Sequence, residues 1–175
     1  METNFLSAKA EIRYCATGWG SYASEPITAG ETVAAFGGSC VSRTALDALS
    51  PNDRAHAIQI DEDLFMVSPV TTAPGETISH SCAPNCGISA GVLVVAMRYI
   101  AAGEQLSYDH AMSSGSDFYD FECRCATPSC RHKVTGSDWM IPELQIAYRG
   151  YFSPYLGKRI ASLVRTGAER RAFAF

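Results

Sequence analysis

The sequence predicts a mostly β domain with small helices toward its C-terminal end. The chain has 175 residues, the length of a single domain, and its 47% apolar and 18% charged residues are typical of a packed globular chain. Between residues 14 and 108, short apolar segments alternate with turn residues, whereas helical patterns appear mainly after residue 140. The longest apolar run, residues 91–97, has the length of a strand and is far shorter than the roughly 20 residues of a membrane helix.

Turn residues divide the first part of the chain into short β segments. The turn Ala29-Gly30 precedes one apolar segment, and the polar turn at residues 61–63 separates two others, as in a hairpin. Further turns contain Gly91 and Gly103. We therefore expect strands at residues 31–36, 55–60, 64–67, 85–89, 91–97 and 105–108.

Helices are expected at three places. Residues 43–49 predict a turn or two of helix that Ser50-Pro51 stops. Residues 142–148 and 154–165 each begin with a proline, which is favoured at the first helical position. The apolar residues of the last helix recur at helical spacing, which predicts an amphipathic helix laid on the body of the domain. These residues are Leu156, Ile160, Leu163 and Val164.

The charge balance limits the classes of partner. The formal net charge is −4, from 14 basic and 18 acidic residues, which argues against binding that depends on many phosphate contacts. We therefore expect no direct nucleic-acid partner. The N-terminus has neither the basic region nor the long apolar stretch of a secretory signal, so we expect a cytoplasmic protein with no membrane partner. The sequence does not indicate an oligomeric state.

The seven cysteines point to a metal site. An odd number of cysteines without a secretion signal argues against a disulfide scaffold. Cys123, Cys125 and Cys130 form a C-x-C-x4-C pattern that offers three thiolates, and a closed structural zinc site needs four ligands. Cys82, in a polar turn, is our candidate for the fourth ligand, with Cys86 and His132 as alternatives. The segment is too short to bury a core of its own, which makes a metal a plausible source of its stability.

Four separated motifs follow one another along the chain. They are T-G-W-G at 17–20, I-S-H-S-C-A-P-N at 78–85, G-E-Q-L-S-Y-D-H at 103–110, and F-E-C-R-C at 121–125 with C-R at 130–131. Together they resemble the SET-domain family of S-adenosylmethionine-dependent lysine methyltransferases, including its post-SET zinc segment. The resemblance covers roughly residues 10–133 and implies a fold of small β sheets with a pseudoknot. It divides the chain into a SET domain at residues 10–112, a post-SET zinc segment at 113–133 and a C-terminal helical extension at 134–175.

The resemblance also implies the ligands of the metal and of the cofactor. It assigns structural Zn²⁺ to Cys82, Cys123, Cys125 and Cys130. It places S-adenosylmethionine along Gly18, Trp19, Gly20, Ser79, His80 and Arg124. Glycines let the backbone approach a ligand closely, and an aromatic face suits a sulfonium or a purine. Ser79 stands where the family usually has asparagine, and a serine cannot make the pair of hydrogen bonds of an amide.

The acceptor channel is where the sequence departs from the family. In the triplet Tyr108-Asp109-His110, Tyr108 matches the residue that tunes how many methyl groups fit, and His110 replaces the usual catalytic tyrosine. Phe36 and His56 align with further channel tyrosines. We expect methyl transfer to a protein lysine or to another amine, including a small-molecule amine. Two alternatives stay open: other chemistry on a small molecule with His110 or His56 as base, and an inactive binding module.

Overall fold

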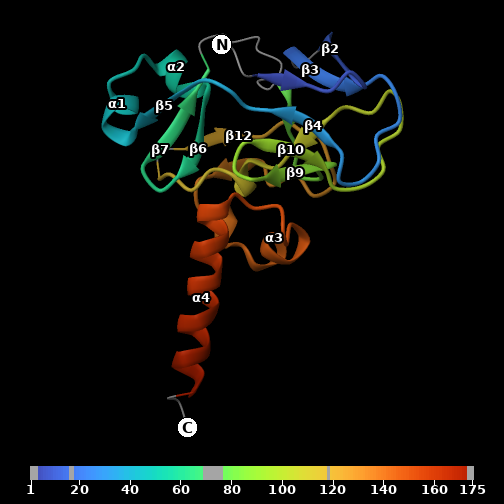
Figure 1. Ribbon diagram of the computed structural model, residues 1–175. Coiled ribbons are helices and arrows are strands. Elements are labelled where there is room, and N and C mark those ends of the chain that lie inside the picture. The colour runs from blue at the N-terminus through green and yellow to red at the C-terminus, as the bar shows by residue number, and fades with distance from the viewer. Residues whose placement is uncertain (1–3, 16–17, 69–76, 118, 173–175) are drawn as a thin grey trace.

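The computed structural model describes residues 4–15, 18–68, 77–117 and 119–172, and Figure 1 shows their arrangement. Its largest sheet has six strands in the order β1-β4-β10-β9-β11-β8. The first three contacts in this order are antiparallel, whereas β11 is parallel to both β9 and β8. The strands are β1 (Phe5–Leu6), β4 (Thr32–Ala35), β10 (Leu93–Ala96), β9 (Cys86–Ser89), β11 (Ser107–Tyr108) and β8 (Ser79–His80).

Three smaller sheets surround this one. The hairpin of β2 (Ala10–Cys15) and β3 (Gly18–Ala23) carries the T-G-W-G motif, and β12 (Asp120–Glu122) pairs with β13 (Lys133–Thr135) around the cysteine-rich loop. The third sheet has the order β5-β7-β6 and carries two short helices. Its elements are β5 (Ser39–Ser42), α1 (Arg43–Asp47), α2 (Pro51–Ala55), β6 (Ala57–Asp61) and β7 (Leu64–Val67).

The core lies where the sheets meet. Val94 and Ala96 alternate inward along β10, and they are fully buried together with Val33 and Ala34 of β4 and Ile88 of β9. This alternation follows from the pleat of a strand, which turns successive side chains to opposite faces. The core therefore fixes the register of β9 and β10, and with it the position of β11, which leads into the Tyr108-Asp109-His110 triplet.

The predicted fold class is confirmed, with local corrections. The expected stop before Ser50-Pro51 is confirmed, since α1 ends at Asp47. A second helix that was not expected begins at the same dipeptide: the Ser50 hydroxyl accepts a hydrogen bond from the Asp53 amide, and Pro51 occupies the first turn. Serine favours the N-cap and proline the first helical position, so the same dipeptide that ends one helix starts the next. As a consequence β6 begins at Ala57, two residues later than expected.

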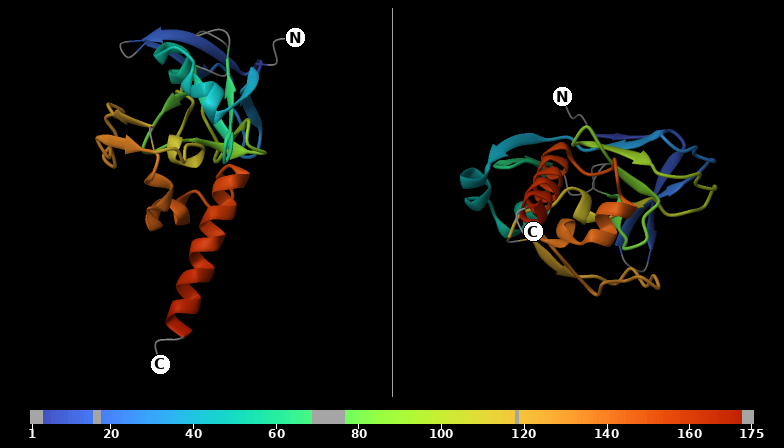
Figure 2. Two further views of the ribbon diagram at one scale, coloured as in Figure 1. Left: turned by 90° about the vertical axis from the view of Figure 1, so that its left-hand side faces the viewer. Right: turned by 90° about the horizontal axis from the view of Figure 1, so that it is seen from below.

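The C-terminal extension is helical, as expected, but its last helix is not laid on the body. The extension contains the 3-10 turn η3 (Asp138–Met140), α3 (Pro142–Ala147) and α4 (Pro154–Ala172). Tyr155 and Leu156, in the first turn of α4, are buried, whereas Leu163 is 46% exposed. Figures 1 and 2 show the rest of α4 extending away from the sheets. No helix within the described residues is long and apolar enough to cross a membrane.

Candidate cofactor pocket and metal centre

Four cysteines from two distant segments meet at one point. The sulfur atoms of Cys82, Cys123, Cys125 and Cys130 all lie within 4.8 Å of one another. The Cys82 and Cys123 sulfurs are 3.8 Å apart, which matches the spacing of about 3.8 Å between thiolates that each lie ~2.3 Å from a tetrahedral zinc ion. Of the three candidates for the fourth ligand, the structure brings only Cys82 into this described cluster.

The two alternatives lie elsewhere. Cys86 is fully buried in β9, where burial raises the pKa of its thiol to about 12 and its sulfur contacts the Asn85 side-chain oxygen at 3.4 Å. His132 is exposed and adopts a positive φ of 62° in the loop before β13. Within the cluster, burial opposes ionisation of Cys125, but hydrogen bonds from the Thr127 hydroxyl and from nearby backbone amides outweigh it and lower its pKa to about 6. Thiolate is the form that binds a metal.

The loop of the cysteine cluster is closed by its own backbone. The Cys123 amide donates to the His132 carbonyl at 2.7 Å, which extends the β12–β13 pairing toward the metal ligands. The Arg131 amide lies 3.4 Å from the Cys82 sulfur, and the Ser129 hydroxyl donates to the Cys82 carbonyl at 3.3 Å. These non-covalent contacts join the cysteine-rich loop to the H-S-C segment.

A pocket of about 560 Å³ lies beside the cysteine cluster. Its lining includes Trp19 from β3, Ser79 and His80 from β8, and Arg124 from between two of the cysteines. Four of the six residues that the sequence assigned to the cofactor thus face one cavity. Its volume lies inside the range of roughly 300–1,000 Å³ that small-molecule sites occupy.

The two assigned glycines lie next to this pocket on β3. A Cβ at Gly20 would lie 2.8 Å from the Gln105 side-chain nitrogen and 3.5 Å from the Ser79 hydroxyl, both of which belong to pocket-lining residues. Gly18 has a φ of +107°, a backbone conformation that side chains disfavour. Gly20 therefore allows β3 to pack against the side chains of Gln105 and Ser79, and Gly18 provides the positive φ at the start of the strand.

The polar side chains of β8 already have partners in the protein. The Ser79 hydroxyl accepts a hydrogen bond from the Gln105 side chain at 3.0 Å, and its own proton remains available as a donor. His80 Nδ1 accepts from the His110 amide at 3.3 Å, and its Nε2 lies 3.4 Å from the Cys82 sulfur. Burial lowers the pKa of His80, so its neutral ring links the pocket to the cysteine cluster.

His110 lines the same pocket and is the centre of an aromatic group. Its ring centroid lies 4.8 Å from that of Tyr108, 5.0 Å from His80, 5.5 Å from Phe121 and 5.8 Å from Tyr119. Burial, aided by His80, lowers the pKa of His110 to about 3, so the imidazole is neutral at physiological pH. Tyr108 is 6% exposed. Its ring meets that of Phe36 edge to face at 5.8 Å.

His56 lies in a different part of the fold. It ends α2, and its neighbour Ala57 lines a small cavity together with Gln59 and Tyr119. The structure thus places His56 in the insert that carries β5, β6 and β7. Its assignment to the catalytic site stays a prediction.

Sequence reasoning missed a buried ion pair behind the site. Asp109 is fully buried, and both of its oxygens accept hydrogen bonds from the Arg131 guanidinium, at 2.6 and 2.8 Å. Asp109 also accepts from the Tyr148 hydroxyl at 3.0 Å, while Arg131 donates to Asp138 at 2.8 Å. Burial alone would raise the pKa of Asp109, but the hydrogen bonds and the charge of Arg131 outweigh it and lower this pKa. The sequence held two hints of this ion pair. Asp109 lies between Tyr108 and His110, and Arg131 follows a predicted zinc ligand.

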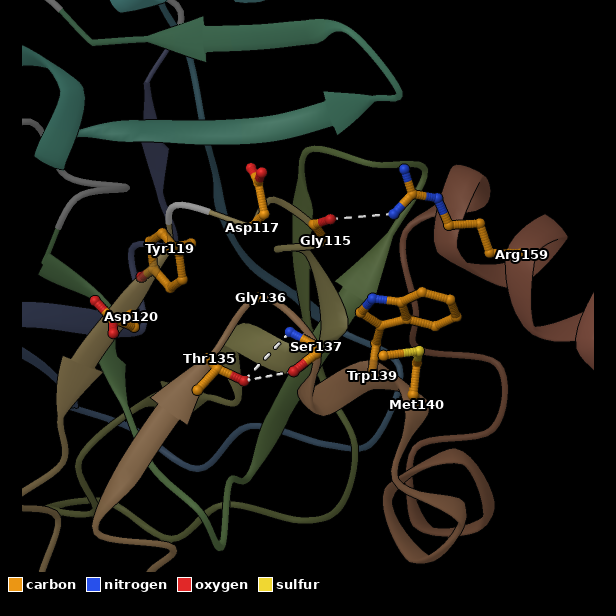
Figure 3. A pocket seen from close by; sticks show the side chains of 10 residues that line it. All are labelled: Gly115, Asp117, Tyr119, Asp120, Thr135, Gly136, Ser137, Trp139, Met140 and Arg159. Atoms are coloured by element: carbon orange, nitrogen blue, oxygen red, sulfur yellow. Dashed lines mark hydrogen bonds between the residues drawn. The ribbon is translucent and has the colours of Figure 1, made fainter.

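Tyr119 was also missed. Its hydroxyl is hydrogen-bonded to His110 Nδ1, although Tyr119 belongs to none of the four sequence motifs. Tyr119 lines a second pocket, of about 400 Å³, together with Trp139 and Arg159. Figure 3 shows this pocket between the β12–β13 hairpin and the start of α4.

Comparison with known proteins agrees with this arrangement. Residues 18–111, more than half of the chain, match the family model described as SET domain. An H3 lysine-4-specific histone-lysine N-methyltransferase of Mycosarcoma maydis is 29% identical over 127 residues, which are 65% of this chain and 9% of that protein. Histone-lysine N-methyltransferase ash1 of Drosophila melanogaster is 29% identical over 140 residues, 73% of this chain and 6% of that protein. The chain therefore aligns with less than a tenth of either relative. The match over residues 18–111 shows that the chain belongs to the SET domain family.

Proposed function

We propose that this chain is a protein-lysine N-methyltransferase that uses S-adenosylmethionine and carries a structural zinc ion. One observation carries the proposal: residues from separated motifs line a single pocket that also reaches His110. The relatives that are named histone-lysine methyltransferases support a lysine as the acceptor.

The residues around the pocket fit the proposed cofactor. Trp19 is 56% exposed and offers an aromatic face to a sulfonium or a purine. The absence of a side chain at Gly20 lets β3 pack closely against Gln105 and Ser79, two residues that line the pocket. Arg124 is exposed at the pocket and can pair with a carboxylate. When bound, S-adenosylmethionine supplies a methyl group on a positively charged sulfur.

The cysteine cluster fits zinc in a structural role. Four thiolates fill the tetrahedral shell of zinc, so no position remains open for a substrate or a reactive water. The hairpin that carries three of these cysteines buries only Val134 completely. Its order would therefore depend on the metal.

The protein residues of the reaction centre would align and desolvate the acceptor. An acceptor amine must be neutral to use its lone pair, and a buried, aromatic environment disfavours an ammonium. Tyr108, His110 and Phe121 provide such an environment. The neutral His110 adds no positive charge that would repel a cationic methyl donor.

Calorimetric titration of zinc-loaded protein with S-adenosylmethionine tests the cofactor. We expect binding in the micromolar range, which corresponds to about −8 kcal/mol. The variant Trp19→Ala should weaken binding about tenfold, whereas Tyr99→Ala, which removes an exposed ring outside the pocket lining, should not. Folded, zinc-loaded protein that binds no S-adenosylmethionine would contradict the proposal.

Methyl transfer tests the acceptor. Zinc-loaded protein is incubated with methyl-labelled S-adenosylmethionine and either recombinant histone H3 or poly-lysine, and labelled lysine is identified by mass spectrometry. We expect methyllysine in at least one of them. Cofactor binding without any methyllysine would favour the alternative of other chemistry on a small molecule.

A further inference from the structure

Tyr119 and His110 form a bridge between cavities. His110 lines the pocket of about 560 Å³, and Tyr119 lines both the second pocket and the small cavity beside β6. The hydrogen bond between the Tyr119 hydroxyl and His110 Nδ1 joins the two linings. The hydrogen-bonded pair therefore contributes one residue to the first pocket and one to the other two cavities.

The backbone of Tyr119 is held firmly, despite its place in a serine- and glycine-rich link. Its amide donates to the Ser116 carbonyl at 3.2 Å, and its carbonyl accepts from the Gly136 amide at 2.7 Å. A Cβ at Gly136 would lie 1.7 Å from the Ser116 carbonyl oxygen, so only glycine permits this approach. The turn before Tyr119 is therefore locked against the end of β13.

Two other parts of the chain hold the same link. Gln59 of β6 accepts hydrogen bonds from the Gly115 amide at 3.1 Å and from the Ser116 hydroxyl at 2.7 Å. From α4, the Tyr155 hydroxyl donates to the Ser113 carbonyl at 2.6 Å, and Arg159 donates to the Gly115 carbonyl at 3.1 Å (Figure 3). The position of Tyr119 is thus set by the insert and by the C-terminal extension together.

The protonation states leave an acceptor on the phenol oxygen. Burial, with contributions from Tyr108 and Asp109, raises the pKa of Tyr119, and burial lowers that of His110, so both groups are neutral. A phenol that donates its proton to Nδ1 keeps lone pairs on its oxygen. Such an oxygen can accept a hydrogen bond from an amine N–H or a weaker one from a polarised methyl C–H.

The second pocket suits an amine carried on an apolar stem. Trp139 and Met140 give it apolar surface. The exposed carboxylates of Asp117 and Asp120 also line it, and they pair with Arg43 and Lys133. Its cation Arg159 is already paired with Glu62, and its ring contacts are to Trp139 and Tyr155. The pocket therefore adds no unpaired positive charge of its own that would repel an ammonium.

We propose that Tyr119 is a catalytic residue of the methyl transfer, whose phenol oxygen accepts a hydrogen bond from the acceptor amine, and that His110 is the residue that positions it. This role rests on the proposed function. In the transfer, the amine lone pair forms the new N–C bond, the S–C bond breaks with its electrons remaining on sulfur, and the amine proton leaves to solvent. Tyr119 forms no covalent bond and orients the lone pair toward the methyl carbon.

The test compares three variants in the labelled transfer assay with histone H3 and poly-lysine. Tyr119→Phe should reduce the rate at least about tenfold, the effect of one hydrogen bond present in the transition state. Tyr99→Phe, a change on an exposed ring, should keep the wild-type rate. The double variant His110→Tyr/Tyr119→Phe, which returns a phenol to the bridge from the other side, should recover much of the loss. Binding of S-adenosylmethionine should change less than about twofold in Tyr119→Phe, since Tyr119 does not line that pocket.

A second readout does not depend on turnover. In histidine-selective ¹⁵N NMR of the zinc-loaded chain without cofactor, Tyr119→Phe should shift the Nδ1 resonance of His110, and Tyr99→Phe should not. Two results would overturn the role of Tyr119 and leave the proposed function intact. One is an unshifted His110 resonance, and the other is a Tyr119→Phe variant that methylates at the wild-type rate. A wild type that binds S-adenosylmethionine and methylates neither acceptor would overturn both.

Discussion

Replacing Arg131 with methionine would leave a carboxylate buried without its counter-ion. The Asp109 side chain is fully buried and that of Arg131 is 16% exposed, so solvent cannot replace the lost hydrogen bonds. Asp109 would retain only its bonds from Tyr148 and from the Ala111 amide. Removing one partner of a buried pair costs about 3–5 kcal/mol, because the remaining charge stays desolvated. The methionine keeps the backbone amide that contacts Cys82 and much of the side-chain volume.

The assay is urea unfolding of zinc-loaded protein. With a denaturant slope of about 2 kcal/mol per molar, the loss corresponds to a midpoint lower by about 1.5–2.5 M. Lys133→Met is the matched control: Lys133 and Asp120 form an ion pair in the same hairpin, but their side chains are 64% and 57% exposed, so its loss should cost less than about 1 kcal/mol. The double variant Asp109→Asn/Arg131→Met removes the carboxylate charge of Asp109 as well and should recover part of the loss, while Asp138 still lacks its bond from Arg131.

Two results would refute this reasoning. One is an Arg131→Met variant that is no less stable than Lys133→Met. The other is a double variant as unstable as Arg131→Met alone, since the cost would then come from packing and not from the uncompensated charge. Zinc content is measured in every variant, so that loss of the metal is not mistaken for loss of the ion pair.

Three further predictions follow from burial and close packing. A strong chelator should remove one zinc per chain and lower the melting temperature, and a chain with no bound metal would contradict the metal site. In zinc-loaded protein the exposed Cys40 should react with a thiol reagent within minutes, whereas Cys86, whose buried thiol has its pKa raised to about 12, should react only on unfolding; equal rates would contradict its burial. Gly87→Ala should cost about 1–3 kcal/mol, because its Cβ would lie 2.6 Å from that of Tyr151. Gly157→Ala, in open space within α4, should instead stabilise by roughly 0.5–1 kcal/mol, and similar unfolding midpoints for the two variants would refute the packing argument.

The cysteine cluster and the pocket beside it were predictable from the sequence for different reasons. Three of the cysteines lie within eight residues, so local chain geometry already brings their sulfurs together. Cys82 is 41 residues from Cys123, and it was preferred to Cys86 and His132 because it lies in a polar turn, a choice with which the family resemblance agreed. The pocket likewise depends on motifs that are far apart, and their order along the chain was the available signal.

Helix boundaries and helix docking were less predictable. Ser50-Pro51 stops one helix and starts another, and the sequence pattern predicted only the stop. The apolar stripe of α4 predicted a docked helix, and among its described side chains those of the first turns meet an apolar surface, at Trp139 and Phe152. Periodicity shows that a helix has an apolar side and does not show how far the body extends beneath it.

The sequence by itself determined the mostly β class, the motifs of the SET domain and the set of cysteines, because these depend on short-range pattern and spacing. Only the tertiary structure decided that Asp109 pairs with Arg131 and that Tyr119 reaches His110. In both contacts, the β12–β13 hairpin and the docked first turns of α4 bring the two side chains together. This packing places a partner beside the buried charge and beside the phenol. The Asp109–Arg131 contact spans 22 residues and the His110–Tyr119 contact spans nine, and at neither separation does local sequence pattern indicate which side chains meet.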